Sequence, residues 1–255
     1  AAGSASGTIT GRPLTVTGVA VTSKAYDGTT SAAITGTLVG VLNSDAVTLV
    51  GTGTFASKNV GANQVVTSTS TLSGAAAGNY TLTQPTGLTG TITAKALSIG
   101  APTIASKVYD GTTAAGAVTV GALTGLVGSE ILTVTGTAAA YSSAAVGTYS
   151  GVVVTYTLAN GGSGNTAGLA SNYSLAAGSA SGTITGRALT VTSPVVTSKA
   201  YDGTTVATIT GTLSGVLNSD TVTLVGTGTT AARRAAHART RQERRRRMFG
   251  EGWEG

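Results

Sequence analysis

The segment K-x-Y-D-G-T-T occurs three times in this chain, at residues 24–30, 107–113 and 199–205. Its tyrosines are Tyr26, Tyr109 and Tyr201, so the intervals are 83 and 92 residues. Similarity at a fixed spacing indicates that one folding unit has been copied. An interval of this length is too long for one coil of a solenoid and suits a small independent domain.

A second marker recurs after 175 residues, which is the sum of the two tyrosine intervals. The string AAGSASGTITGR opens the chain and recurs at residues 176–187, and residues 1–54 differ from 176–229 at eight positions. The array therefore alternates two types of repeat. The recurring T-I-T-(A/G) junctions predict these segments: the terminal strand of a preceding repeat (1–11), a first repeat (12–94), a second repeat (95–186), a truncated third repeat (187–229) and an Arg-rich tail (230–255).

Within a repeat the hydrophobic pattern has a period of two. L-T-V-T at 14–17, A-V-T-L-V at 46–50 and G-T-I-T at 90–93 place aliphatic residues on one face and threonine on the other. Segments rich in Gly, Asn, Ser or Pro separate these runs. The pattern predicts an all-β protein of tandem small antiparallel domains, arranged as beads on a string. Six to seven short strands per repeat favour an immunoglobulin-like sandwich, with a β-grasp-like sheet as the alternative.

The composition supports folded β-structure. Hydrophobic residues make up 41% of the chain, which argues against disorder, and 38 glycines serve the turns. Cysteine is absent, which excludes disulfides and thiolate metal sites. No apolar run of about 18 residues occurs. Because the chain has no initiator methionine and no apolar leader, we expect an internal piece whose targeting signal lies elsewhere.

The basic charge belongs to the tail. Residues 1–229 carry seven basic and six acidic side chains, a balance of +1, and the remaining +5 of the net +6 lies in residues 230–255. We therefore expect no nucleic-acid binding by the repeats. The abrupt change of composition after Thr229 favours an out-of-frame or disordered tail; the alternative is a genuine polyanion-binding arm of eight arginines.

The Tyr-Asp-Gly segment is interpreted as a turn. Asp-Gly between two β-prone runs is a strong turn signal, because glycine accepts a positive φ and aspartate bonds back to a nearby amide. The tyrosine ring can cover the edge of a core. We expect a structural role, with ligand binding as the alternative, for Tyr26, Asp27, Gly28, Tyr109, Asp110, Gly111, Tyr201, Asp202 and Gly203.

Catalytic chemistry has few candidates here. The only histidine is His237, so the repeats have no nucleophile–histidine arrangement. Each repeat has two carboxylates for acid–base work, and the N-S-D context of Asp45 indicates a turn. Two carboxylates without a D-x-D-x-D-G loop also make a poor calcium site. We predict no catalytic residue, no cofactor and no metal, and hence no enzyme.

Several motifs in order carry a family resemblance: K-x-Y-D-G-T-T, then V-L-N-S-D-x-V-T-L, G-T-G-T-F-A-S-K-N-V-G, A-G-N-Y-T-L-T and G-T-I-T-A-K-A-L. Over residues 1–229 the chain resembles the YDG repeat domain of bacterial filamentous-haemagglutinin-like surface exoproteins. The second repeat departs from the pattern, with L-V-G-S-E at 126–130 where its neighbours have V-L-N-S-D.

The resemblance implies a structural and adhesive role. It implies a secreted or outer-membrane-associated adhesin of a Gram-negative bacterium, in which tandem β-domains form a stalk or display array. The implied partners are host-surface or bacterial-surface receptors, with outer-membrane association through regions outside this chain. A glycan-binding module working through the loops is the alternative, although the aromatic content of 4% offers few rings for sugars.

Overall fold

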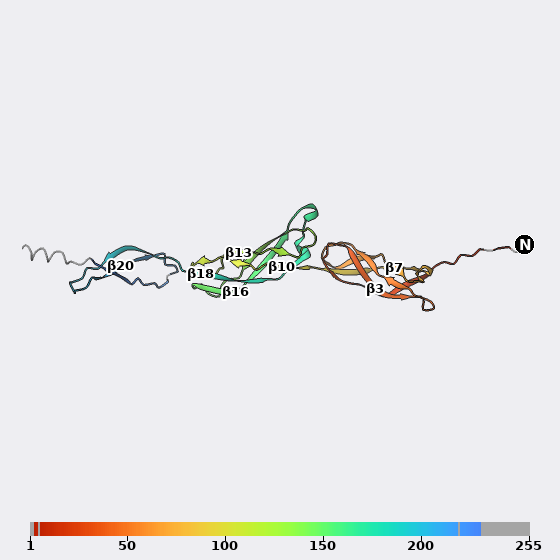
Figure 1. Ribbon diagram of the computed structural model, residues 1–255, viewed down its shortest axis with the longest axis horizontal. Coiled ribbons are helices and arrows are strands. Elements are labelled where there is room, and N and C mark those ends of the chain that lie inside the picture. Colours follow the sequence, from red (N-terminus) through yellow and green to blue (C-terminus); the bar gives the residue numbers. More distant parts are fainter. Residues whose placement is uncertain (1–2, 5, 219, 231–255) are drawn as a thin grey trace, which may run out of the picture. The chain divides into compact units, whose positions relative to one another are not determined.

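The computed structural model describes residues 3–4, 6–218 and 220–230, and its described part is all-β, with three short 3-10 helices and no α-helix (Figure 1). The chain divides into two compact units. The first holds the described residues up to 106 together with 114–142 and 148–183. The second holds 107–113, 143–147 and the described residues from 184 onward.

The first repeat forms a curled sheet in the first compact unit. Seven strands follow the order β2-β9-β6-β5-β3-β1-β8, and β4 pairs with β7 in a separate ribbon. Strands β1 and β9 contact each other although three strands lie between them in this order, so the sheet curls over its own face. The elements are β1 (Arg12–Val21), β2 (Lys24–Ala25), β3 (Ser31–Val39), β4 (Thr48–Val50), β5 (Thr52–Phe55), β6 (Gly61–Ser68), β7 (Thr71–Ser73), η1 (Ala77–Asn79), β8 (Tyr80–Leu82) and β9 (Leu88–Thr93).

The predicted alternation is visible strand by strand. In β3, Ala32 and Ile34 are buried while Ser31, Ala33 and Thr35 are exposed. Successive side chains of a strand point to opposite faces, so Ala32 and Ile34 reach the core and Thr35 reaches the other side.

The strands of the second repeat are divided among three smaller sheets. In the first unit β10 lies between β14 and β17, β11 pairs with β13, and β18 and β15 flank β16. The elements are β10 (Lys95–Ile99), β11 (Thr103–Ile104), β13 (Val118–Thr119), β14 (Leu123–Thr124), β15 (Leu132–Ala138), β16 (Gly147–Asn160), η2 (Gly164–Thr166), η3 (Ala170–Asn172), β17 (Tyr173–Leu175) and β18 (Gly178–Thr185).

The sheets are mixed, which corrects the expectation of purely antiparallel pairing. Strand β1 runs parallel to β8, with Arg12 opposite Tyr80, and β10 runs parallel to β17, with Lys95 opposite Tyr173. A third parallel pair joins β2 to β9. Parallel pairs need long crossover connections, so neighbouring runs of sequence do not reveal them. The choice between an immunoglobulin-like and a β-grasp-like architecture stays a prediction.

The core of the first unit is continuous across the two repeats. One buried cluster contains Tyr26, Phe55 and Ile92 of the first repeat together with Leu132 and Tyr173 of the second. Consecutive repeats thus share a hydrophobic core at this point, which independent beads on a string would not do.

The second compact unit contains the truncated third repeat. Strand β12 (Lys107–Val108) pairs in parallel with the end of β18, and a three-stranded antiparallel sheet follows the order β19-β20-β21. These strands are β19 (Thr190–Val196), β20 (Val206–Ser214) and β21 (Gly226–Thr229). Every residue of β19 is exposed, and Ala207 is the buried hydrophobic residue of the described third repeat. The predicted tail falls, from residue 231, outside the described residues.

Candidate functional site at the junction between consecutive repeats

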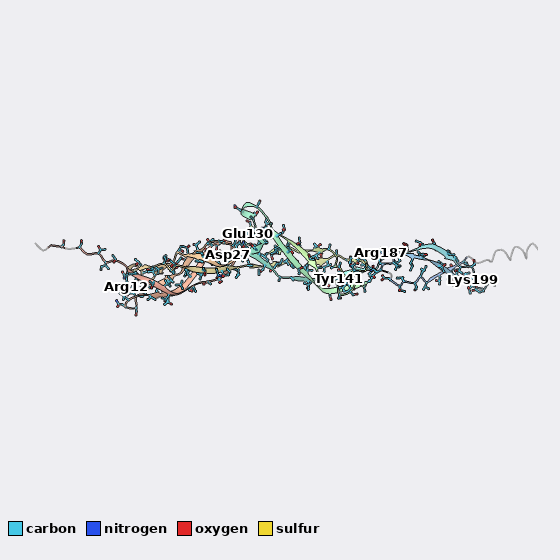
Figure 2. The ribbon with its side chains drawn as sticks, turned by 180° about the vertical axis from the view of Figure 1, so that it is seen from behind. Arg12, Asp27, Glu130, Tyr141, Arg187 and Lys199 are labelled. Carbon is cyan, nitrogen blue, oxygen red and sulfur yellow. The ribbon has the colours of Figure 1, made fainter. Side chains whose placement is uncertain are left out.

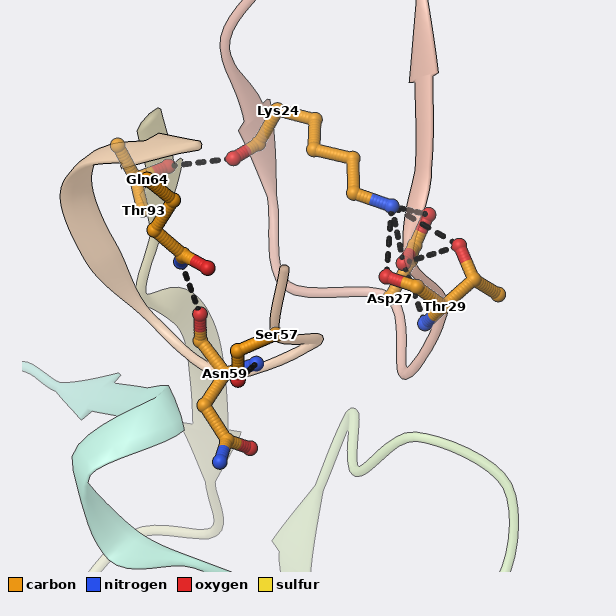
Figure 3. Close-up of polar contacts among 7 residues, drawn as sticks. All are labelled: Lys24, Asp27, Thr29, Ser57, Asn59, Gln64 and Thr93. Carbon is orange, nitrogen blue, oxygen red and sulfur yellow. Dashed lines mark hydrogen bonds and ion pairs between the residues drawn. The ribbon is translucent and has the colours of Figure 1, made fainter. Parts of the chain in front are cut away.

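Each Tyr-Asp-Gly segment is closed by the lysine that begins the motif. The Lys24 Nζ donates to Asp27 Oδ1 at 2.8 Å and to the Thr29 carbonyl at 2.9 Å (Figure 3). The Thr29 amide donates to the same Asp27 Oδ1 at 2.8 Å. The aspartate therefore bonds back to the amide two residues later, as an Asx turn does.

The other two copies repeat these bonds. Lys107 contacts Asp110 at 2.9 Å and Lys199 contacts Asp202 at 2.9 Å, and in each copy the amide two residues after the aspartate donates to its carboxylate at 2.9 Å. The glycine of each turn has a left-handed backbone, with φ of +79° at Gly28, +76° at Gly111 and +77° at Gly203. This conformation favours glycine, because a Cβ would approach the backbone too closely.

These hydrogen bonds hold the aspartates ionised. Burial raises the pKa of Asp27, but the bonds from Lys24 and Thr29 outweigh it and lower the pKa to about 2. Bonds from Lys107 and Thr112 lower the pKa of Asp110 to about 2. Bonds from Lys199 and Thr204 do the same at Asp202. A carboxylate with such a pKa does not exchange protons near neutral pH, which disfavours a role as general base.

The tyrosine of the first turn projects into the second repeat. Its hydroxyl donates to Glu130 Oε1 at 2.5 Å, and the Tyr173 hydroxyl donates to Glu130 Oε2 at 2.6 Å. The two rings meet edge to face, with centroids 5.4 Å apart and an interplanar angle of 80°. Tyr26 is 2% exposed and Tyr173 is 6% exposed. Figure 2 labels Glu130 and Asp27, the neighbour of Tyr26, at this junction.

A second pair of contacts lies beside the tyrosines. The buried side chain of Asn172 accepts a hydrogen bond from the Val60 amide at 2.9 Å and donates one to Asn59 Oδ1 at 3.0 Å. The loop around Asn59 is held by Gln64, whose Nε2 donates to the Asn59 carbonyl at 2.6 Å (Figure 3). An asparagine that is 1% exposed needs such partners, because an unsatisfied buried amide is costly.

The second compact unit contains the same tyrosine–carboxylate bond between the second and third repeats, here in an exposed position. The Tyr109 hydroxyl donates to Asp220 Oδ2 at 2.9 Å. Asp220 ends V-L-N-S-D, which aligns with L-V-G-S-E ending in Glu130. The tyrosine of one repeat thus contacts the acidic residue of the next repeat at both junctions.

The turn glycines also permit close approach to the following repeat. A Cβ built on Gly28 would lie 2.9 Å from Val127 Cγ1, and one on Gly111 would clash with the Asn218 side chain. A Cβ on Gly203 would meet nothing within 4 Å, and Tyr201 is 96% exposed. Among the described residues, the third turn therefore makes no contact like those of the first two turns.

Burial and the acidic partner suppress ionisation of the junction tyrosines. Burial, and then the hydrogen bond to Glu130, raise the pKa of Tyr26 to about 12. The same two causes raise the pKa of Tyr173 to about 12. The hydrogen bond to Asp220 raises the pKa of Tyr109. The junction therefore requires neutral tyrosines facing a carboxylate.

Sequence reasoning selected the turn residues and missed their partners. It considered Glu130 only as one of the two carboxylates of the second repeat and assigned no role to Asn172 or Tyr173. One signal was present in the sequence. Glu130 ends L-V-G-S-E, whose copies V-L-N-S-D also end in an acid, and Asn172 and Tyr173 lie in S-N-Y-S, whose copy G-N-Y-T keeps the Asn-Tyr pair.

No group of three potential metal ligands occurs within the described residues. Within the same part of the chain, no helix is long and apolar enough to cross a membrane.

Fold and junction together define a tandem-repeat β-protein whose copies are joined by a recurring tyrosine–carboxylate contact. The YDG domain model matches three segments of the chain, residues 10–87, 93–181 and 185–243, and the chain belongs to the YDG domain family. Neither the curated proteins nor the solved structures contain a match to this chain.

Proposed function

We propose that this chain is a structural and adhesive repeat region of a secreted or outer-membrane-associated bacterial adhesin of the haemagglutinin-like kind. In this role the tandem β-modules act as a stalk or display array. The observation that carries the proposal is the recurrence of one contact, Tyr26 with Glu130 and Tyr109 with Asp220, in successive repeats.

The junction supplies what a stalk needs. A buried tyrosine that bonds a carboxylate resists bending between repeats, because bending would expose the ring and leave the carboxylate without its donor. Hydrogen bonds to charged groups contribute about 1.5–3 kcal/mol each, and the cost rises when a buried partner is left unpaired. Nearest-neighbour interfaces of this kind give repeat arrays their stiffness and cooperativity.

The turn chemistry also supports a structural role. Lysine, threonine and backbone atoms of the same turn occupy the carboxylates of Asp27, Asp110 and Asp202. The Oδ1 atom of each of these carboxylates is thus occupied within the turn, which leaves fewer acceptors for a ligand. The tyrosine hydroxyls of the first two turns are likewise occupied by Glu130 and Asp220.

A spacer-replacement experiment tests the function. In the bacterium that encodes the chain, codons 12–186 are deleted or replaced by an unrelated β-domain tandem of equal length. We expect deletion to reduce adhesion of the cells and the unrelated spacer to restore it. Persistent loss of adhesion with the spacer would show that the repeats themselves bind the receptor. Antibodies against residues 12–186 should label intact cells or the culture medium; labelling only after lysis would contradict the surface location.

Glycan binding is the second candidate, favoured by one observation. Tyr141 and Tyr149 stack with centroids 4.8 Å apart and an interplanar angle of 12°, beside a shallow depression lined in part by Ser142, Thr148 and Val153. Tyr141 is 3% exposed, so Tyr149 is the ring of this pair that is suited to stack on a sugar beside these hydroxyl groups. A glycan array probed with the full chain and with Tyr149→Ala separates this function from that of a spacer.

A further inference from the structure

Two tyrosines from consecutive repeats share one carboxylate. The Tyr26 hydroxyl donates to Glu130 Oε1 at 2.5 Å, and the Tyr173 hydroxyl donates to Glu130 Oε2 at 2.6 Å. Both oxygens of a carboxylate are bonded to the same carbon atom, so the hydroxyl ends of the two side chains are held around one group. We use the term junction pair for Tyr26 and Tyr173.

The rings of the junction pair are also in contact. Their centroids lie 5.4 Å apart with an interplanar angle of 80°, so the edge of one ring points at the face of the other. Both rings belong to the buried cluster that the first two repeats share. Because the pair is fixed at its hydroxyls and packed at its rings, the ring carbons next to the hydroxyls, the ortho carbons, are kept near one another.

Tyrosine is the most easily oxidised side chain of the repeats. Residues 1–229 contain no cysteine, methionine or tryptophan, since Met248 and Trp253 lie in the tail. All eight tyrosines of the chain lie within residues 1–229. A one-electron oxidant that acts on the repeats should therefore produce tyrosyl radicals.

Glu130 is placed to assist the oxidation of the junction pair. A phenol that has lost an electron is a strong acid, so the electron leaves more easily when a base takes the hydroxyl proton in the same step. A base must lie within hydrogen-bond reach of the proton that it accepts, and Glu130 meets this condition for both tyrosines.

We propose that Tyr26 and Tyr173 form an oxidative cross-linking site, at which a peroxide-driven one-electron oxidant joins two consecutive repeats through a dityrosine bond. Each phenol gives one electron to the oxidant, and its hydroxyl proton passes to Glu130 and then to water. The two radicals form a carbon–carbon bond between their ortho carbons, and the two ortho hydrogens move to the oxygens, which restores both hydroxyls. The two electrons break the O–O bond of the peroxide; hydrogen peroxide takes up the two released protons and gives two water molecules.

The cross-link locks the junction in a chain that has no cysteine. It connects position 26 to position 173 and closes a loop that contains most of both repeats. A covalent link across a long loop restricts the unfolded chain, as a disulfide does, and so stabilises the folded state. We expect the oxidised chain to unfold at a higher urea concentration than the untreated chain.

A second pair of tyrosines provides an internal comparison. Tyr141 and Tyr149, here called the stacked pair, have ring centroids only 4.8 Å apart. Among the described residues, the Tyr141 hydroxyl contacts the Gly116 amide at 3.5 Å and no carboxylate. Proximity of the rings alone therefore favours a link in the stacked pair, whereas a shared carboxylate favours a link in the junction pair.

Photochemical oxidation of the full chain tests the proposal. A photoexcited ruthenium tris-bipyridyl complex removes single electrons, and persulfate, a peroxide, is the final electron acceptor. Mass spectrometry of proteolytic peptides assigns each dityrosine link, and an equimolar mixture of ¹⁴N- and ¹⁵N-labelled chains distinguishes links within one chain from links between chains. We expect the link of the junction pair to form within one chain and at a lower oxidant dose than that of the stacked pair. Earlier formation of the stacked-pair link would overturn the proposal.

Variants of Glu130 separate proton acceptance from packing. Glu130→Gln has a similar shape but cannot take the proton. Glu130→Asp keeps a carboxylate, and Asp45 and Asp220 occupy the aligned position in the other two repeats. We expect Glu130→Gln to reduce the junction-pair link several-fold and Glu130→Asp to retain it, while the stacked-pair link is the same in both variants. An equal yield of the junction-pair link in Glu130→Gln contradicts the role of the carboxylate.

Two further measurements keep the result independent of folding. Tyr173→Phe should abolish both the junction-pair link and the rise in urea midpoint on oxidation, and Tyr156→Phe should retain both. Hydrogen exchange of the Val60 amide, which bonds Asn172, reports whether the junction stays closed in each variant. If Glu130→Gln opens the junction, the wild-type chain decides: a yield that is constant across neutral pH supports proton transfer to Glu130, and a yield that rises steeply with pH overturns it.

Discussion

Tyr26 donates a hydrogen bond of 2.5 Å to Glu130, a residue 104 positions later in the chain. The bond connects the turn of one repeat to the loop of the next. Tyr173, from the second repeat, donates to the other oxygen of the same carboxylate. Glu130 is therefore the point at which one repeat recognises its neighbour.

Replacing Tyr26 by Phe should destabilise the first unit by about 1–3 kcal/mol, because Glu130 loses a donor in a buried position. Urea unfolding of the full chain, followed by tyrosine fluorescence, measures the change. Tyr201→Phe is the matched control and should stay within about 0.5 kcal/mol, since that ring is exposed. A double-mutant cycle with Glu130→Gln isolates the pair, and a coupling energy near zero would contradict the role given to the bond.

Gly28→Ala and Gly203→Ala separate backbone strain from the junction contact. Both glycines have φ near +78°, with +79° and +77°, so alanine should cost each about 1–2 kcal/mol. Only Gly28 lies against the next repeat, where the new Cβ would approach Val127 Cγ1 to 2.9 Å. We expect Gly28→Ala to cost about 1 kcal/mol more than Gly203→Ala, as overpacked sites do. Equal losses of stability for the two variants in thermal unfolding would show that the turn at Gly28 does not pack tightly against Val127 of the next repeat.

Alkaline pH should open the junction. The pKa of Tyr26 and that of Tyr173 rise from 10.0 to about 12 on folding, so the folded state favours the neutral phenols. Their contribution to stability is complete below pH 10 and is lost as the pH rises through about 12. The free energy of unfolding, measured in urea at several pH values, should fall across this window. Tyr26→Phe should flatten the decline; an unchanged slope would assign the effect to other groups.

The motif lysine, Lys24, should set the pH below which Asp27 stops stabilising the turn. The pKa of Asp27 falls from 3.8 to about 2 on folding, so its stabilising contribution is present above about pH 4 and is lost as the pH falls towards 2. Lys24→Gln removes a strong donor to this carboxylate and should move the pKa of Asp27 upwards. Carboxyl-carbon NMR titration measures it directly, and Asp110 serves as the internal reference that should not move.

The third repeat should exchange its amide hydrogens faster than the first. Strand β19 is exposed along its whole length, and the described third repeat lacks counterparts of β6 and β9, which cover the first repeat. Strands with few buried contacts open at low free energy. Hydrogen exchange followed by mass spectrometry should show rapid exchange across 187–229 and slow exchange across 12–94. Equal protection of the two segments would contradict this.

Local chemistry was readable from particular residues. The alternation of Thr with Leu, Val and Ile predicted the strands, since a two-residue period suits only a pleated chain. The parallel pairing of Arg12 with Tyr80 was not readable, because the two residues lie far apart in the chain and each strand of the pair contributes only three partners. Short strands of this kind leave no periodic signal, and their pairing depends on the closure of the curled sheet.

The chain alone determined that one β-module is repeated, that its Asp-Gly corner suits a turn, and that the positive charge is concentrated in the tail, because each of these is a property of neighbouring residues. Only the tertiary structure decided whether the tyrosine of each turn is buried. Tyr26 and Tyr201 occupy identical heptapeptides, yet one is 2% exposed and the other 96%. The physical reason is that a tyrosine is buried only when another part of the chain provides a hydrophobic surface and an acceptor for its hydroxyl, and the identical local sequence does not specify whether such a partner is present.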